Sequence, residues 1–240
     1  MLSKEISSPQ HPIVKTFVKL RTSRKFRYEQ KQVVIAGIKQ VSEAPSLDIL
    51  LVRTGFSHSL KANQIYSVSE SLLKKVTGLE SPEPMAAIVG MPDWASLNGK
   101  KWILGLDGIQ DPGNLGTLLR TALALGWEGA FMTENCVDPF NEKALRAAKG
   151  ATFRLPLRMD TEKKLCLFAK DYQTWIADPH GKSLNEISSQ KNGFLILGNE
   201  AQGVSETLKA QFNALSIPIA DIESLNVAAA GAILMYNLKS

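Results

Sequence analysis

The 240-residue chain is 44% hydrophobic and 21% charged, with a formal net charge of +5. This composition allows a substantial core and excludes a disordered chain. No apolar run is long enough to span a membrane and the opening residues do not follow the order of a signal peptide, so we expect a cytoplasmic protein without a membrane partner. The two cysteines lack CxxC spacing, which argues against a disulfide scaffold or zinc site. We expect buried free thiols and no metal.

The first 95 residues are typical of a small α/β unit. Apolar residues at helical spacing predict one amphipathic helix over residues 12–28. Beyond it, short apolar runs alternate with polar stretches of helical character. The strand candidates are 33–35, 49–52, 65–68 and 86–89, and the helix candidates are 38–44 and 69–76.

A second alternating series begins at Trp102, after a polar stretch that suits a linker. Strands that alternate with helices predict a mostly parallel sheet covered on both faces. We therefore expect two domains, residues 1–95 and 96–240. The strand candidates of the second are 102–106, 129–132, 153–155, 175–177, 194–197 and 215–217, and the helix candidates are 115–125, 141–149, 162–172, 205–211 and 225–238.

Positive charge gathers at the start of the chain, where the first 40 residues hold nine Lys/Arg against two acidic residues. A solvated basic helix face is the ordinary interpretation. Against a polyphosphate partner, the same cluster is an electrostatic footprint that raises affinity and weakens with salt. The candidate RNA-binding residues are Lys15, Lys19, Arg21, Arg24, Lys25 and Arg27.

The segment 107–120, DGIQDPGNLGTLLR, joins an expected strand to an expected helix. Its Pro-Gly pair favours a turn, and Asn114 is a candidate cap of the helix. Arg120 is the only charged residue between Gly113 and Trp127, in a helix apolar enough to be buried on most sides. Its guanidinium must reach solvent, a carboxylate or an anionic ligand, and its planar fork of donors suits a phosphate.

The segment 197–206, LGNEAQGVSE, runs from a buried strand into a loop that closes with Gly203. Gly198 would let a ligand approach the main chain, while Asn199 and Glu200 offer hydrogen-bond donors and acceptors. Taken alone, this pattern is a weak signal and is more typical of a simple strand-to-helix turn.

The segment 217–235, IPIADIESLNVAAAGAILM, leads into a helix that is apolar all round and rich in small residues. Such a helix is buried, and its small side chains also suit a subunit interface. Ser224 is a candidate N-cap. Ser224 and Asn226 are polar groups at the start of a buried helix, so they need partners, and a bound ligand is one candidate.

Several large enzyme classes lack their signatures here. There is no GxGxxG after a strand, no GxxxxGK[ST], no HExxH and no GxSxG. This argues against Rossmann dinucleotide enzymes, P-loop NTPases, zinc proteases and common serine hydrolases.

Taken together and in order, DPGNLGxxxR, LGNExxG and IPxxxxxSLNVxxAxG resemble the three signature motifs of the SpoU/TrmH-type RNA 2′-O-ribose methyltransferases of the SPOUT superfamily. The resemblance covers residues 102–240. Residues 1–95 more weakly resemble the N-terminal substrate-binding domain of that family. There, Ala36 stands where many relatives have a glutamate before glycine.

The resemblance implies an α/β chain with a small N-terminal RNA-binding domain and a SPOUT-type domain that ends in a trefoil knot. It also implies S-adenosyl-L-methionine as methyl donor and a homodimer. Carried over by motif, the catalytic residues are Asn114, Arg120, Glu200, Ser224 and Asn226. The corresponding contacts to the methyl donor are Leu197, Gly198, Asn199, Gly203, Ile217, Leu225 and Asn226.

A ribose hydroxyl is a poor nucleophile at neutral pH, so the protein must align it with the methyl group and help to remove its proton. The family proposal makes the arginine a base, but a guanidinium hardly ever loses its proton. Our hypothesis is that Arg120 binds the phosphate beside the target ribose, that this phosphate or water assists proton removal, and that Asn114 and Glu200 orient the reacting groups. A 2′-hydroxyl nucleophile implies RNA as substrate. The separate first domain favours ribosomal RNA, with transfer RNA as the other possibility.

Two other functions fit parts of the pattern. A non-catalytic RNA-binding or ribosome-assembly factor that keeps the fold would bind RNA without methyl transfer, although all the motif positions are filled. An α/β enzyme that uses a nucleotide cofactor on small metabolites would have no affinity for RNA, and it leaves the basic first 40 residues unexplained. Salt-dependent RNA binding separates this last function from the other two.

Overall fold

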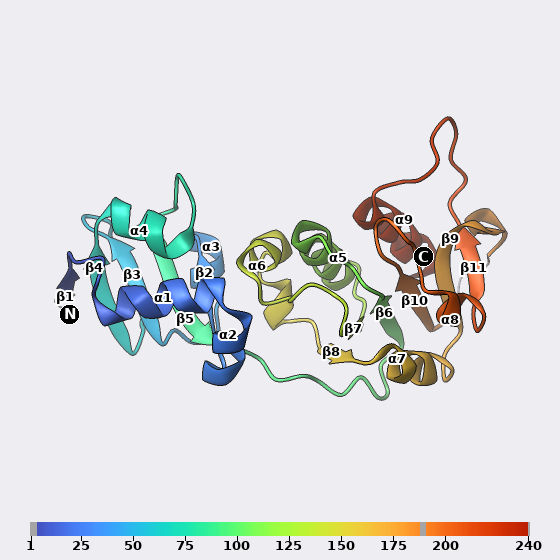
Figure 1. Ribbon diagram of the computed structural model, residues 1–240, viewed down its shortest axis with the longest axis horizontal. Helices are drawn as coiled ribbons and strands as arrows, with labels where there is room; N and C mark the ends of the chain where they lie inside the picture. Colours follow the sequence, from blue (N-terminus) through green and yellow to red (C-terminus); the bar gives the residue numbers. More distant parts are fainter. Residues whose placement is uncertain (1–3, 188–190, 240) are drawn as a thin grey trace. The chain divides into compact units, whose positions relative to one another are not determined.

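The computed structural model describes residues 4–187 and 191–239 and divides into two compact units. The first unit comprises the chain up to Asp93 together with Phe140–Arg146, and the second comprises Trp94–Pro139 and the residues from Ala147 onward. Each unit is built on its own β-sheet (Figure 1). The residues 140–146 therefore belong structurally to the first unit although they lie within the sequence of the second.

The first unit contains a five-stranded mixed sheet. Its strands are β1 (Lys4–Ile6), β2 (Gln32–Ala36), β3 (Ile49–Arg53), β4 (Gln64–Val68) and β5 (Met85–Gly90). They are arranged in the order β1-β4-β3-β5-β2, with β5 antiparallel to both of its neighbours and the other pairs parallel. The sequence pattern missed β1, because this three-residue strand buries only Ile6.

The helices of the first unit are α1 (Pro12–Thr22), α2 (Arg24–Gln30), α3 (Ile38–Ser42) and α4 (Glu70–Thr77). Residues of α1, α2 and α4 pack in the core cluster on one face of the sheet, whereas Val41, the buried residue of α3, is not part of that cluster. Phe17 of α1 and Leu73 of α4 pack with Leu51 of β3 in one core cluster. The prediction of a single helix over residues 12–28 is wrong, because Ser23 adopts an extended conformation and its side chain accepts a hydrogen bond from the Phe26 N–H. A serine that caps a new helix in this way ends the previous one.

The second unit contains a six-stranded sheet in which every pair is parallel, as predicted. Its strands are β6 (Trp102–Leu106), β7 (Gly129–Thr133), β8 (Leu157–Asp160), β9 (Thr174–Ser183), β10 (Gly193–Leu197) and β11 (Asn213–Ser216). Their order is β11-β9-β10-β6-β7-β8. A strand predicted at 153–155 is wrong: residues Ala151–Phe153 form a 3-10 turn, and β8 starts only after Pro156.

Both faces of this sheet are covered, because successive side chains of a strand point to opposite faces. The later helices are α5 (Pro112–Ala124), α6 (Glu142–Ala148), α7 (Glu162–Ala169), α8 (Glu206–Lys209) and α9 (Val227–Lys239). In β10, Leu195 packs in the cluster that holds α5 and α9, whereas the next residue, Ile196, packs in the cluster that holds α7 and α8. The two cysteines are buried and free, as predicted.

Helix α9 lies very close to α5 and β10. A Cβ added at Gly231 of α9 would lie 2.5 Å from Leu118 of α5 and 2.6 Å from Leu197 of β10. A larger residue at this position would have to displace these two buried leucine side chains, which agrees with a closely packed helix rich in small residues. The chain leaves β11 at the edge of the sheet and returns to its middle through residues 217–226. Whether this return closes a trefoil knot stays a prediction.

Candidate active site

The carboxyl ends of β6 and β10 lie side by side, with Leu106 opposite Leu197. The segments that follow them, residues 107–111 and 198–205, therefore leave the sheet at the same edge. The loop after β11, residues 217–226, begins at this edge as well, because all of the described strands in the sheet are parallel. Ligands of open parallel sheets bind outside the carboxyl ends of the strands. The three sequence motifs thus start where a ligand site is expected.

The Glu200 carboxylate holds the first of these segments in place. Its Oε1 accepts hydrogen bonds from the Asp111 N–H and from Asn114 Nδ2, both at 3.1 Å, and its Oε2 accepts one from the Gln110 N–H at 3.1 Å. Partial burial would raise the pKa of Glu200, but the hydrogen bonds from Asn114, Gln110 and Asp111 outweigh it and lower the pKa below the usual range. The side chain is therefore held as a carboxylate.

Asn114 links Glu200 to the third motif. While its Nδ2 donates to Glu200, its Oδ1 accepts a hydrogen bond from Asn226 Nδ2 at 3.0 Å. Three polar side chains, one from each motif, thus form the hydrogen-bonded chain Glu200–Asn114–Asn226. No sequence spacing shows this contact, because 86 residues separate Asn114 from Glu200 and 112 separate it from Asn226.

The helix caps differ from those expected. Asp111, not Asn114, caps α5: its side chain accepts from the Asn114 N–H at 2.8 Å, and Pro112 follows at the first helical position. An Asp before Pro-Gly is itself a sequence signal for this cap, and it could have identified Asp111. Asn226, not Ser224, caps α9, since its Oδ1 accepts from the Ala228 and Ala229 N–H groups.

Two of the predicted catalytic residues stand apart from the Glu200–Asn114–Asn226 chain. Arg120 and Ser224 are both exposed, and neither makes a hydrogen bond or ion pair to another described residue. Arg120 therefore satisfies its charge with solvent rather than with a carboxylate of its own chain. Both side chains are available to a ligand.

Among the predicted contacts to the methyl donor, Leu197 is buried in the core and the next six residues form a tight loop. Asn199 and Gly203 exchange two main-chain hydrogen bonds of 2.9 Å, and Asn199 Nδ2 donates to the Gly108 carbonyl at 2.8 Å. A Cβ added at Gly198 would lie 2.1 Å from the main chain of Gly203 and Val204. The closure of the loop itself therefore requires glycine at position 198.

The loop between β11 and α9 presents apolar side chains and unpaired main-chain groups. Ile219 is 39% exposed and Ile222 is 58% exposed, and Ile217 and Leu225 are half-buried. Within the described part of the chain, no hydrogen bond involves the main chain of residues 218–225. Figure 1 shows this connection standing away from the sheet. Exposed apolar side chains next to free N–H and C=O groups fit a ligand that carries a flat heterocycle with a hydrogen-bonding edge.

The six candidate RNA-binding residues fall into two groups. Lys15, Lys19, Arg24 and Lys25 are exposed on α1 and α2. Two of them lie against aromatic rings, since Lys19 Nζ is 4.1 Å from the centre of the Phe26 ring and the Arg24 guanidinium is 5.4 Å from that of Tyr28. These four side chains form a basic surface on the two helices.

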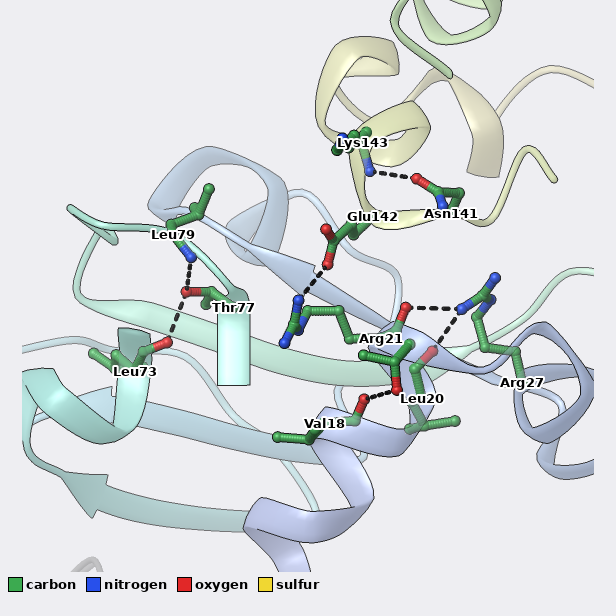
Figure 2. Close-up of polar contacts among 11 residues, drawn as sticks. Val18, Leu20, Arg21, Arg27, Leu73, Thr77, Leu79, Asn141, Glu142 and Lys143 are labelled. Carbon is green, nitrogen blue, oxygen red and sulfur yellow. Dashed lines mark hydrogen bonds and ion pairs between the residues drawn. The ribbon is translucent and has the colours of Figure 1, made fainter. Parts of the chain in front are cut away.

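Arg21 and Arg27 instead have partners inside the first unit (Figure 2). Arg21 Nη1 forms an ion pair with Glu142 at 3.2 Å, and its side chain is 20% exposed. Arg27 is only 4% exposed, and its Nη1 donates to the carbonyls of Leu20 at 2.8 Å and Arg21 at 3.0 Å. These carbonyls belong to the last turn of α1, so Arg27 stabilises the end of that helix.

Two further observations concern the described residues as a whole. No helix among them is long and apolar enough to cross a membrane. No three of their His, Cys, Asp or Glu side chains gather into a group that would hold a metal ion.

Solved structures that resemble this chain include RNA methyltransferases. The AdoMet-bound rRNA methyltransferase of Sinorhizobium meliloti superposes with a TM-score of 0.86, at 26% identity, over 98% of this chain and 97% of its own. An RNA 2′-O ribose methyltransferase superposes with a TM-score of 0.85, at 25% identity, over the same shares of the two chains. Fold and site together define a methyltransferase of the SPOUT type.

The family follows from the sequence comparisons. The model of the SpoU rRNA Methylase family matches residues 101–236, and that of the MRM3-like substrate binding domain matches residues 11–87. The chain belongs to the SpoU rRNA Methylase family. A relative from Bacillus subtilis, the 23S rRNA (guanosine(2553)-2′-O)-methyltransferase RlmP, is 34% identical over 98% of this chain and 99% of its own. Human mitochondrial rRNA methyltransferase 3 is 29% identical over 70% of this chain and 44% of its own.

Family membership confirms the resemblance seen in the three motifs, the α/β architecture with its parallel sheet, and S-adenosylmethionine as the methyl donor. The protein is an enzyme that transfers a methyl group to RNA. The unpaired main chain and apolar side chains of residues 218–225 are consistent with this cofactor.

Proposed function

We propose that this protein methylates a ribose 2′-hydroxyl in ribosomal RNA, and that the Glu200–Asn114–Asn226 chain forms the floor of its active site. The hydrogen bonds that join the three motifs at the carboxyl edge of the sheet support the proposal most directly. The full-length similarity to a methylase named for a 23S rRNA guanosine favours ribosomal over transfer RNA. We propose the cytoplasm as the compartment of the reaction, which the full-length similarity to a bacterial enzyme favours over a mitochondrion.

The two asparagines supply donors for the substrate. Each amide nitrogen carries two hydrogens, and each uses one of them inside the chain, in Asn114 toward Glu200 and in Asn226 toward Asn114. One N–H per amide is left for an incoming ribose oxygen. Bound S-adenosylmethionine supplies a methyl group on a positively charged sulfur, which is already activated for transfer. The task of the asparagines is to hold the hydroxyl oxygen in line with it.

Glu200 anchors the site rather than acting as a base. Its two oxygens accept three hydrogen bonds, and the lowered pKa shows that its ionised form is favoured. A carboxylate stabilised in this way is a weak proton acceptor. We assign water, or the phosphate beside the target ribose, as the group that accepts the proton of the 2′-hydroxyl.

Arg120 binds that phosphate. Its guanidinium is exposed and makes no hydrogen bond or ion pair within the described residues, so both of its parallel N–H groups are available to one phosphate. Ser224 is exposed near the end of the loop between β11 and α9, where its hydroxyl suits a polar group of the RNA or of S-adenosylmethionine. Main-chain groups of Gly198, Ile217 and Leu225 hold the methyl donor, with Leu197, Asn199 and Gly203 shaping the adjoining loop.

The first unit binds RNA through the basic surface formed by Lys15, Lys19, Arg24 and Lys25. These four side chains are exposed, and Lys25 also lies 3.8 Å from Glu29 of the same helix. The sequence from residue 101 onward is near neutral, so the excess positive charge of the chain lies in the first unit. Arg21 and Arg27 have structural roles beside this surface. Arg21 is paired with Glu142, and Arg27 is buried at the end of α1. Phosphate contacts of this kind position an RNA without reading its sequence.

The enzyme acts as a homodimer through α9. Ile233 is 38% exposed and Tyr236 is 63% exposed on this helix, whereas Leu234, Met235 and Leu238 are buried in the core of the second unit. Two large exposed side chains one helical turn apart suit an interface. A second copy would cover them.

Methyl transfer to unmodified RNA tests the function. The purified protein is incubated with labelled S-adenosylmethionine and either ribosomal or transfer RNA that lacks modifications, and alkali-resistant linkages are mapped in the products. We expect label at one position of ribosomal RNA, and loss of transfer in Asn114→Ala. RNA binding without transfer in the wild type would support a non-catalytic assembly factor instead.

A further inference from the structure

Asp107 is a buried carboxylate that the mechanism above does not use. It follows the last residue of β6, is 6% exposed, and makes no ion pair with a described residue. A buried charge without a cation is costly unless hydrogen bonds stabilise it. Its position directly after Leu106, which lies opposite Leu197 in the sheet, places it at the edge from which the three motifs extend.

The carboxylate joins the end of β7 to the far end of the loop that follows β10. Its Oδ2 accepts the Ser205 N–H at 2.9 Å, and its Oδ1 accepts from the Thr133 hydroxyl at 3.4 Å. The same hydroxyl oxygen accepts the Gly108 N–H at 3.0 Å, and the main-chain N–H of Asp107 donates to Leu197 at 2.8 Å. The segment after β6, the end of β7 and the loop after β10 are thereby held together.

Ser205 matters because it ends the loop that carries Glu200. This loop runs from Gly198 to Ser205, and the Ser205 side chain caps α8. The loop is attached to the segment 107–111 three times: by Asp107 at its far end, by Asn199 Nδ2 on the Gly108 carbonyl, and by Glu200 on the Gln110 and Asp111 N–H groups. Of these attachments, only the one at Asp107 is made by a buried side chain.

We propose that Asp107 is a positioning residue for methyl transfer, which fixes the Ser205 end of the loop and thereby orients Glu200 toward Asn114. The inference rests on the proposed roles of Glu200 and Asn114. Loss of the acceptor for Ser205 frees one end of the loop, so that Glu200 no longer holds the Asn114 amide in line for the ribose oxygen. Misplacement of a reacting group by about 1 Å costs roughly a hundredfold in rate.

The negative charge of Asp107 lowers the stability of the fold, although we propose that the side chain assists methyl transfer. Burial raises the pKa of Asp107, the hydrogen bond from Ser205 lowers it, and nearby Glu162 raises it further, with a raised pKa as the result. Cys136, whose own pKa is raised mainly by burial, is the other titratable group beside it. Because the folded pKa lies above the unfolded one, the stabilising contribution is present below the unfolded pKa and is lost as the pH rises through the folded pKa. At neutral pH the ionised carboxylate therefore costs stability.

The test compares Asp107→Ala and Asp107→Asn with a matched control, Asp160→Asn. Asp160 also ends a strand of the same sheet. Partial burial would raise its pKa, but the hydrogen bonds that its carboxylate accepts from Lys164, the Thr161 N–H and Arg158 lower it. We expect Asp107→Ala to lose about a hundredfold in kcat for RNA methylation. Asp107→Asn should keep or raise the melting temperature and lose less activity, because its amide oxygen still accepts from Ser205. Asp160→Asn should melt earlier with unchanged kcat.

A double variant separates positioning from general damage. In a Glu200→Ala background, Asp107→Ala should cost less than about threefold in kcat, because residues that act through one another are not additive. Full additivity would overturn the proposal, as would wild-type kcat in Asp107→Ala.

Hydrogen exchange gives a readout that does not depend on activity. Asp107→Ala should speed amide exchange in residues 199–205 while leaving that of α7 unchanged, and Asp160→Asn should leave the 199–205 loop unchanged. Unchanged exchange in this loop for Asp107→Ala would also refute the proposal. A wild-type protein that fails to methylate RNA would refute the proposed function alone, and the exchange data would still decide on Asp107.

Discussion

Two arginines in this chain show opposite uses of a guanidinium. Arg120 extends into solvent without a protein partner among the described residues, whereas Arg27 is buried and donates to the main chain at the end of α1. A count of charges treats both as the same kind of residue. Only the three-dimensional structure separates a group that can bind a ligand from one that stabilises a helix end.

Replacement of Arg120 by lysine tests its proposed contact to phosphate. Lysine keeps the charge but loses the planar fork, so we expect kcat/KM for RNA to fall about 10- to 100-fold, the equivalent of one bidentate charged hydrogen-bond pair. The matched control is Arg154→Lys, an exposed arginine in the same unit. Steady-state methylation rates decide, and near-wild-type activity in Arg120→Lys would contradict a required bidentate contact.

Replacement of Arg27 by alanine tests its structural role. It removes two hydrogen bonds to α1 carbonyls from a buried site, so the free energy of unfolding should fall by about 2 kcal/mol or more. Arg24→Ala is the control, since Arg24 is exposed and should cost less than about 1 kcal/mol. Urea denaturation measures both. Equal stability of the two variants would show that Arg27 does not support the helix end.

At the scale of elements, the sequence predicted what depends on local pattern and missed what depends on distant partners. The strand at Trp102–Leu106 was predicted to the residue, because it is a continuous apolar run between polar segments. The break at Ser23 was missed, because the apolar spacing continues across it while a single side-chain cap ends the helix. Asp107 was missed as well, since its partners Thr133 and Ser205 are 26 and 98 residues away.

The loop between β11 and α9 makes a testable contribution to cofactor binding. Ile222→Ser removes an exposed apolar side chain that a bound methyl donor would cover, and we expect a loss of about 1–2 kcal/mol, a five- to thirtyfold rise in Kd for S-adenosylmethionine. Leu167→Ser on α7 is a control of matched exposure, 56% against 58%. Calorimetric titration measures both variants. Equal affinities would remove this loop from the cofactor site.

The exposed face of α9 predicts the oligomeric state. A charge at the centre of an apolar interface is strongly unfavourable, so Tyr236→Glu should convert a dimer into monomers at micromolar concentration. Ile38→Glu introduces the same charge at an exposed apolar residue of the first unit and should leave the dimer intact. Sedimentation velocity distinguishes the two species. A monomeric wild type, or a dimeric Tyr236→Glu, would contradict the proposed interface.

For the molecule as a whole, charge is unevenly shared between the two units. The first 40 residues carry the excess of basic residues, whereas residues 101–240 hold fourteen basic and fifteen acidic residues. The sequence alone shows this uneven distribution of charge. It does not show which basic residues are available to RNA, because Arg27 is buried and Arg21 is paired with Glu142. The proposed RNA surface is therefore smaller than the charge count suggests.

Salt dependence of RNA binding tests that surface. In the double variant Lys15→Glu/Lys25→Glu, the slope of log affinity against log salt should become shallower by about 0.7–0.9 for each phosphate that the protein no longer neutralises. Lys163→Glu/Lys170→Glu changes the net charge equally at exposed residues of the second unit and should have a much smaller effect. Filter binding at several salt concentrations measures the slopes. Identical slopes for the two double variants would argue that net charge alone attracts RNA.

The placement of Phe140–Arg146 with the first unit affects any attempt to dissect this enzyme. The chain passes from one unit to the other three times, after Asp93, Pro139 and Arg146. A protease nick after Asp93 would therefore leave two pieces that still adhere, because Glu142 remains paired with Arg21 and Phe140 remains packed beside Tyr28. A recombinant fragment that begins at Trp94 would instead carry Phe140 and Leu145 with nothing to bury them, and would be prone to aggregate.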